Sequence, residues 1–162
     1  MQRFSIVDRF FHVGYTVAYR MMRVYWAIRR PRTHGALVAV WHDGKILLVR
    51  NSYHDYYSLP GGYVRTGESG LEAAKRELKE EIGLDLSGDQ LHRSLDLEHI
   101  WESKRERLEL FCMECDRAPT IEVDGREVLS AEYFEPERAL KLSMFPPIRR
   151  HILERTAAVA GI

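Results

Sequence analysis

The sequence predicts an α/β protein with one globular domain and an additional amphipathic helix before it. Three observations support this prediction. Residues 1–33 show helical spacing of apolar side chains, and short runs rich in Val, Leu and Ile then alternate with further helical patterns. A chain of 162 residues, 45% of them apolar, is also sufficient for one core. Because no repeat, low-complexity tract or linker divides the remainder, we expect the globular domain to cover residues 34–162.

The N-terminal segment has the pattern of a helix that ends at Pro31. Its longest uncharged stretch, residues 10–19, is about half of the roughly 20 residues that a membrane span needs. Three of its arginines form a separate stripe: Arg20, Arg23 and Arg30. The apolar side chains recur at spacings of three, four or seven: Phe4, Val7, Phe11, Ala18, Met21, Tyr25 and Ile28.

The formal net charge of zero conceals an uneven distribution of charge. Residues 1–34 hold seven arginines and one acidic residue, so the remaining chain carries a matching negative charge. The zero total excludes a protein that is basic over its whole surface. Three roles for the basic helix stay open: packing on its own domain or on a twin subunit in a homodimer, lying on an anionic membrane surface, or contacting RNA or another polyphosphate.

The domain begins with two short strands joined by a tight turn. Apolar runs at residues 36–41 and 45–50 flank Asp43-Gly44, a strong hairpin signal. The later pattern predicts a polar, tyrosine-rich loop at 51–58, strands at 91–102 and 107–115 around a charged turn at 103–106, a last strand at 131–134, and helices at 136–142 and 147–158.

A central helix is predicted to begin after Ser69. Ser69 and Glu72 have the spacing of a capping box, and Gly83 is a typical C-terminal stop. The apolar stripe that we expect to face the core consists of Leu71, Ala74, Leu78 and Ile82.

The same helix carries a cluster of carboxylates. Glu77, Glu80 and Glu81 stand at positions i, i+3 and i+4, so their side chains share one face and repel one another. A bound cation would reverse that repulsion. Carboxylate oxygens are hard ligands, which favour Mg²⁺, Mn²⁺ or Ca²⁺ over Zn²⁺.

The loop before the helix suits the same chemistry. Gly61 and Gly62 allow the backbone to approach a ligand closely, and the Gly61 carbonyl is a candidate metal ligand. Arg76 can hold a carboxylate through two parallel hydrogen bonds, and Glu68 is its expected partner.

This segment resembles the Nudix box, G-x5-E-x7-R-E-U-x-E-E-x-G-U, where U is apolar. The match covers residues 62–84 without a departure, and weaker similarity extends over about residues 35–145. The matching positions are Gly62, Glu68, Arg76, Glu77, Leu78, Glu80, Glu81, Gly83 and Leu84.

The resemblance to Nudix hydrolases implies an α/β/α sandwich with a mixed central sheet. It also implies Mg²⁺-dependent or Mn²⁺-dependent hydrolysis of the diphosphate bond in a nucleoside diphosphate derivative, such as a nucleotide sugar, ADP-ribose or a dinucleoside polyphosphate. By the same resemblance, Glu77, Glu80, Glu81 and the Gly61 carbonyl bind the metal. Arg76 orients the glutamates, while Gly62, Glu68 and Gly83 support the site.

The general base is not decided by the box. Some family members use a glutamate from a later loop, and Glu127 is the candidate here, with Glu122 and Glu132 behind it. Two other activities stay open: a regulatory module that binds nucleotides without turnover, and removal of pyrophosphate from RNA 5′ ends. Loss of box glutamates would favour the module, but this box is intact.

The remaining residues of interest have less specific patterns. Two cysteines, Cys112 and Cys115, are too few for a disulfide framework, which favours a reducing, cytoplasmic location. They also lack partner residues for a zinc site. The tyrosines of the loop suit either stacking on a base or packing: Tyr53, Tyr56 and Tyr57. Three histidines are interpreted as structural or surface residues: His54, His92 and His99.

Overall fold

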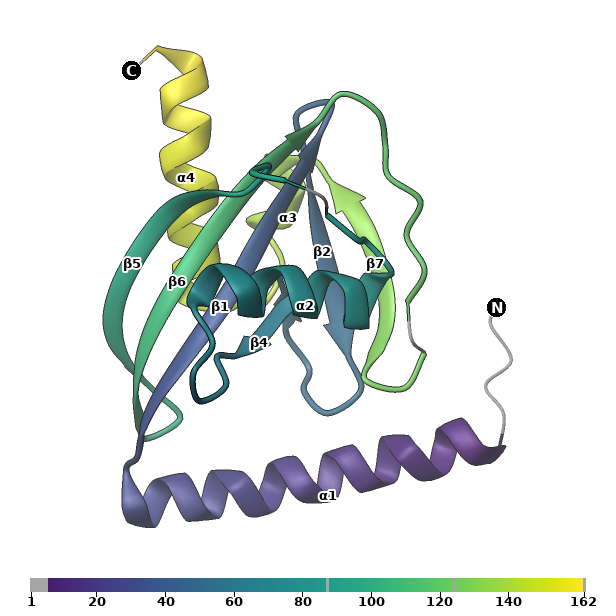
Figure 1. Cartoon of the computed structure of the whole chain (residues 1–162), viewed down its shortest axis with the longest axis vertical. Helices are drawn as coiled ribbons and strands as arrows, with labels where there is room; N and C mark the ends of the chain where they lie inside the picture. The colour runs from purple at the N-terminus through teal and green to yellow at the C-terminus, as the bar shows by residue number, and fades with distance from the viewer. Residues whose placement is uncertain (1–5, 87, 124, 162) are drawn as a thin grey trace.

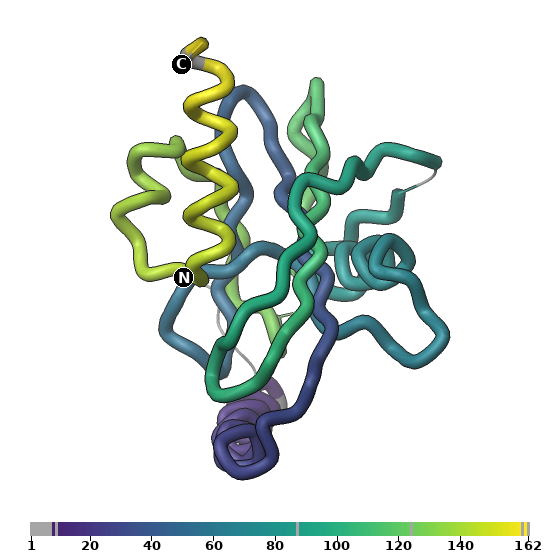
Figure 2. Tube along the Cα trace, turned by 90° about the vertical axis from the view of Figure 1, so that its left-hand side faces the viewer, coloured from purple at the N-terminus to yellow at the C-terminus, as the bar shows by residue number. Residues whose placement is uncertain are grey.

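The computed structural model of the chain has three layers and one additional helix (Figure 1). It describes residues 6–86, 88–123 and 125–161. A mixed sheet of seven strands lies between α2 (Gly70–Ile82) on one face and α4 (Pro146–Ala160) on the other (Figure 2). The expected α/β/α arrangement is therefore confirmed.

The centre of the sheet is a long parallel pair, β1 (Arg32–His42) and β6 (Lys104–Cys115). Beyond β6 lies the antiparallel β5 (His92–Trp101). On its other edge β1 pairs with β2 (Lys45–Asn51) only next to their turn, and near its start it pairs with β4 (Gly61–Tyr63). The remaining strands, β3 (Tyr57–Ser58) and β7 (Val128–Phe134), both pair with β2.

Two tight turns connect neighbouring strands. Asp43 and Gly44 both have positive φ, as the predicted hairpin turn requires. Glu102 and Ser103 also have positive φ, so the second turn consists of these two residues and β6 begins at Lys104. The predicted charged turn at residues 103–106 is therefore wrong in extent, because neither Glu nor Ser is a typical residue for this conformation.

The central helix α2 begins and ends as its sequence predicts. The Ser69 side chain accepts a hydrogen bond from the Glu72 N–H, and the Glu72 side chain accepts one from the Ser69 N–H. Gly83 ends the helix in the left-handed conformation. Ala74, Leu78 and Ile82 are buried, while Leu71 is only partly buried against the same cluster.

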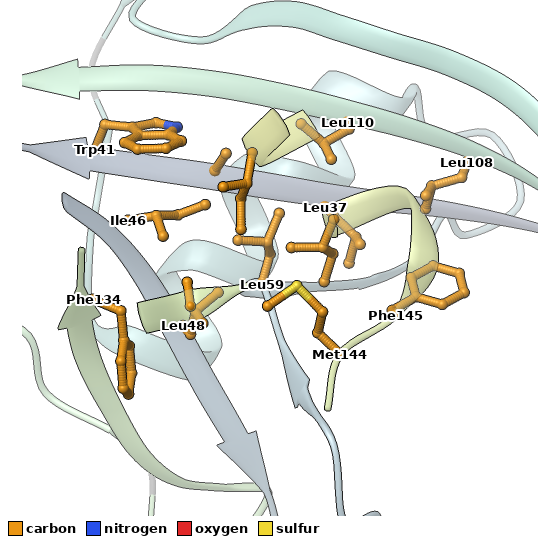
Figure 3. Close-up of a cluster of buried hydrophobic side chains, with 14 residues drawn as sticks. Leu37, Trp41, Ile46, Leu48, Leu59, Leu108, Leu110, Phe134, Met144 and Phe145 are labelled. Carbon is orange, nitrogen blue, oxygen red and sulfur yellow. The ribbon is translucent and has the colours of Figure 1, made fainter. Parts of the chain in front are cut away.

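Each face of the sheet has its own apolar core. The core under α4 includes Trp41, Leu59 and Ile148 and is shown in part in Figure 3. The core under α2 includes Val38 and Phe111. Alternating side chains of β1 enter the two cores, so this strand is buried on both sides over most of its length.

Several predicted boundaries shift in the structure. Residues 51–58 include the end of β2 and the short β3 in addition to a loop, and β4 was not predicted. The last two helices are α3 (Pro136–Ala139) and α4. Cys112 contacts the core under α4 and Cys115 the core under α2, as expected for residues three apart on a strand, and both are free thiols.

The N-terminal helix α1 (Ile6–Arg29) lies across one end of the sheet (Figures 1 and 2). The side of α1 that meets the domain only partly coincides with the apolar stripe of the sequence, of which the Phe11 ring contacts Arg126. Trp26 is buried and Tyr19 partly buried against the domain, whereas Met21 and Ile28 of the predicted stripe are 68% and 75% exposed. Phe4 and the side chain of Val7 lie outside the described residues.

Polar contacts attach both ends of α1 to the domain. Near its start, His12 Nε2 lies 3.0 Å from the Gly125 carbonyl oxygen. Further along, the Tyr19 hydroxyl donates to Glu102, and Arg23 lies 3.5 Å from the same carboxylate. Packing on its own domain is therefore established for α1. Among the described helices, none combines the length and hydropathy that crossing a membrane requires.

Candidate active site

The loop of the box folds directly onto the helix of the box. Glu81, 5% exposed, accepts a hydrogen bond of 2.9 Å from the Gly61 N–H. Gly61 has φ +144°, and a Cβ there would lie 2.2 Å from the Ala36 carbonyl oxygen, so only glycine fits. A Cβ on Gly62 would lie 2.5 Å from Glu77 Oε1. The two glycines thus let the backbone contact two glutamates of the box.

Arg76 connects the other carboxylates. Its Nε and Nη2 donate to the two oxygens of Glu68 at 2.9 and 3.0 Å, the fork expected from the sequence. Its Nη1 donates to Glu77 at 2.6 Å and to Glu80 at 3.2 Å. Hydrogen bonds from Arg76 lower the pKa of Glu68 to about 2. Burial raises the pKa of Glu77, and Arg76 opposes that effect.

The expected meeting of three carboxylates is not present. Within the residues that the structure describes, no three His, Cys, Asp or Glu side chains gather as metal ligands. Arg76 binds Glu77 and Glu80, and Glu81 turns to the Gly61 N–H. The donor set nevertheless fits a hard divalent cation, because all three side chains offer oxygens and the pKa of half-buried Glu77 is raised. The metal assignment stays a prediction.

A largely aromatic pocket of about 290 Å³ lies beside the box loop. Gly62 and Glu127 line it together with residues of α1, so the N-terminal helix forms one wall. The ring residues around it are Tyr15, Tyr19, Trp26, Tyr53, His54, Tyr56, Tyr63, Trp101 and Phe145. Rings of this kind suit a planar group such as a base.

A buried ion pair forms part of the pocket wall. Lys104 Nζ lies 3.1 Å from Glu106 Oε1 and donates to the Tyr63 hydroxyl at 2.7 Å. The ammonium also lies 4.5 Å from the centre of the Trp26 ring and 4.9 Å from that of Tyr63. Burial alone would lower the pKa of Lys104, but Glu106 and Tyr63 raise it above its usual value. The sequence analysis placed Lys104 and Glu106 in a charged turn and did not predict that they are buried as an ion pair.

Glu127 comes to the pocket from the segment before β7. Its Oε1 accepts a hydrogen bond of 3.1 Å from the Tyr53 hydroxyl, and its backbone carbonyl accepts one from the Ser52 N–H. Burial raises the pKa of Tyr53, and the charges of Glu127 and Glu81 add to that rise. Tyr53 therefore interacts electrostatically with the carboxylates of both Glu127 and Glu81. The alternatives Glu122 and Glu132 are exposed and do not line the pocket.

The tyrosines and histidines of the sequence analysis have different positions. Tyr53 and Tyr56 line the pocket, whereas Tyr57 packs edge-on against Phe134 in the core. His54 stacks on Tyr56 with ring centres 3.8 Å apart, and burial lowers its pKa to about 4. His54 therefore contributes to the pocket as an uncharged ring. Two histidines lie on β5 outside the pocket: His92 and His99.

Comparison with known proteins identifies the family. The family model described as "NUDIX domain" matches residues 31–156, which is most of the chain. The protein belongs to the Nudix family. An Ap4A hydrolase from C. elegans, solved in a binary complex, has the same fold with a TM-score of 0.67 at 21% identity, covering 80% of this chain and 99% of that one.

Curated relatives of this Nudix protein align with part of their length. A U8 snoRNA-decapping enzyme from Homalodisca vitripennis is 29% identical over 63% of this chain and 55% of its own. An NAD-capped RNA hydrolase, NudC, from Vibrio atlanticus is 27% identical over 74% and 44%. An ADP-ribose pyrophosphatase from Methanocaldococcus jannaschii is 49% identical over 26% and 27%. The Nudix chain thus spans about half or less of each relative.

The Arg76 fork provides a test of how the box is held. Arg76→Lys keeps the positive charge, but a single ammonium cannot bind Glu68 and Glu77 in the same geometry. We expect kcat to fall about tenfold to a hundredfold, the usual scale for residues that support a metal site. Steady-state kinetics on the best nucleotide substrate measure it. Arg107→Lys is the matched control, because Arg107 makes a similar fork to Asp96 on the exposed face of β5 and β6. Equal losses in both variants would contradict a local role.

Proposed function

We propose that this Nudix protein is a pyrophosphohydrolase that cleaves the diphosphate bond of a nucleoside diphosphate derivative with Mg²⁺ or Mn²⁺. The observation that carries the proposal is the intact box, folded so that Glu77 and Glu81 contact the Gly61-Gly62 backbone beside the pocket. A surface with only solvated glutamates would not need glycine at position 62, where a Cβ would lie 2.5 Å from Glu77 Oε1.

The proposed chemistry assigns separate tasks to the residues around the pocket. Glu77, Glu80, Glu81 and the Gly61 carbonyl would hold the divalent cation, which when bound supplies positive charge for the phosphoryl oxygens. Arg76 fixes the directions of Glu77 and Glu80. Glu127 is the proposed acceptor of a proton from water, because its carboxylate lies in the pocket that also contains the box loop.

The pocket supports an adenosine-containing substrate. ADP-ribose and the ends of Ap4A and NAD-capped RNA, named in the relatives and the solved structure, share an adenosine joined to a chain of phosphates. The stacked pair of His54 and Tyr56 and the ring of Trp101 offer flat surfaces to such a base. We therefore propose ADP-ribose and dinucleoside polyphosphates as the first substrates to test.

Hydrolysis of a diphosphate bond at the 5′ end of RNA is the second candidate, since two of the relatives described above carry RNA-decapping or capped-RNA names. A screen of nucleotide sugars, ADP-ribose, Ap4A and NAD-capped RNA with Mg²⁺ or Mn²⁺, and with EDTA as control, separates the candidates. Metal-dependent release of products from any member supports hydrolysis. A member that binds tightly and is recovered intact, with no turnover of the others, would instead support a binding module.

Glu127→Gln tests the assignment of the general base. The amide keeps the size and the acceptor for Tyr53 but cannot take a proton, so we expect kcat to fall about a hundredfold, with little change in KM. Glu132→Gln is the control, because Glu132 is an exposed carboxylate on β7 outside the pocket. A Glu127→Gln variant with unchanged kcat would rule out this role.

A further inference from the structure

The helix α1 has a second apolar face, directed away from the domain. Tyr19 and Trp26 occupy the inward face and line the pocket. The opposite side presents large apolar side chains at spacings of three and four, each at least half exposed: Phe10 80%, Val13 63%, Val17 50%, Met21 68%, Val24 61% and Ile28 75%. A row of this length is far more than the scattered apolar residues of an ordinary surface.

Positive charge borders this outward face. With 100° between successive residues, Arg20 lies on one side of the apolar row and Arg29 on the other. The exposed arginines of the segment are Arg20, Arg23, Arg29, Arg30 and Arg32. The one acidic residue among residues 1–34 is Asp8, which lies 3.9 Å from Arg126 of the domain. The outward face therefore combines apolar side chains with cations and has no carboxylate of its own.

We propose that α1 docks this protein on an anionic membrane surface. Its outward apolar side chains would enter the boundary between headgroups and acyl chains, and its arginines would contact lipid phosphates. The helix would lie in the plane of the surface, in agreement with the absence of a membrane-spanning helix among the described residues. This proposal is independent of the proposed hydrolase activity, because the inward face of α1 and the pocket remain unchanged.

Charge distinguishes the membrane from two other occupants. A second copy packed on this face would bring arginines against arginines, with no acidic side chain on the face to pair with them. A nucleic acid would bind the arginines but leave the apolar row in water. An anionic bilayer accommodates both features together.

Co-sedimentation of the full chain with vesicles tests the proposal. Vesicles of phosphatidylcholine and phosphatidylglycerol in equal parts are expected to bind it, and pure phosphatidylcholine vesicles much less. Arg20→Gln/Arg29→Gln should weaken binding about twenty-five-fold, at about fivefold for each arginine. Val17→Glu/Val24→Glu should weaken it at least about tenfold by removing apolar contact with lipid.

Leu153→Glu/Val159→Glu is the matched control, since it makes the same type of change at exposed positions of α4 and should bind as the wild type does. Circular dichroism and turnover of a soluble nucleotide show that each variant is folded. Binding that is equal for both vesicle types, or unchanged in Val17→Glu/Val24→Glu, would overturn the proposal. So would a wild-type dimer in light scattering that this variant converts to monomer, or RNA binding without vesicle binding.

Discussion

Glu81→Gln is expected to reduce kcat/KM about a thousandfold, within the range of about 10² to 10⁴ for removal of an essential acid-base or metal-site group. Glu81 is 5% exposed and fixed by the Gly61 N–H, so the variant changes the charge of the box while keeping its shape. Glutamine still offers an oxygen to that N–H. The loss should therefore appear in catalysis and not in the position of the loop. Steady-state kinetics with saturating Mg²⁺ or Mn²⁺ provide the measurement.

Glu109→Gln is the matched control for Glu81. Glu109 is also buried, at 3% exposure, and pairs with His34 and Arg93 near the start of α2, outside the pocket. A neutral amide there should lower stability but leave kcat/KM within a few-fold of the wild-type value. If both variants lost the same activity, the effect of Glu81→Gln would be attributed to buried charge in general and not to a role in the site.

Lys104→Met is expected to lower the free energy of unfolding by about 3 to 5 kcal/mol, the usual cost of breaking a buried ion pair by removing one partner. Glu106, 6% exposed, would lose the ammonium that lies 3.1 Å away. The contacts of the cation with the Trp26 and Tyr63 rings would also be lost. Urea denaturation followed by circular dichroism gives the change in stability.

Two further variants distinguish the effect of breaking the buried ion pair from the effect of removing any lysine charge. Lys104→Met/Glu106→Gln removes both charges and should recover part of the stability lost by the single variant. Lys45→Met removes the cation of an exposed pair with Glu135, and should cost no more than about 1 kcal/mol. A single Lys104→Met variant as stable as Lys45→Met would contradict the assigned burial of the pair.

The best-predicted part of the molecule is α2, because its signals are local. The capping box of Ser69 and Glu72 and the left-handed Gly83 are contained within the helix and its ends, so the sequence alone specifies them. The pair of hydrogen bonds between Arg76 and Glu68 could also be predicted, because the two residues stand at a fixed spacing in the box. Metal binding by the three glutamates remains a prediction. Sequence spacing places them on one face of the helix but does not determine the directions of their side chains.

The parts that could not be predicted depend on contacts between distant segments. Lys104 and Glu106 are of residue types that usually lie in water, and their burial follows from Trp26 and Tyr63, which approach from α1 and β4. In α1 both faces carry apolar residues, so helical periodicity could not say which face meets the domain. Only the fold shows that Tyr19 and Trp26 form a wall of the pocket.

The most direct test of the proposed function is a ³¹P NMR time course with ADP-ribose and Mg²⁺. The account predicts that the diphosphate signals are replaced by those of AMP and ribose 5-phosphate, that EDTA stops the change, and that Glu81→Gln slows it about a thousandfold. The same course with Ap4A and NAD-capped RNA covers the related substrates. Intact diphosphate signals with all of these, from a folded protein supplied with Mg²⁺ or Mn²⁺, would contradict the proposed hydrolysis.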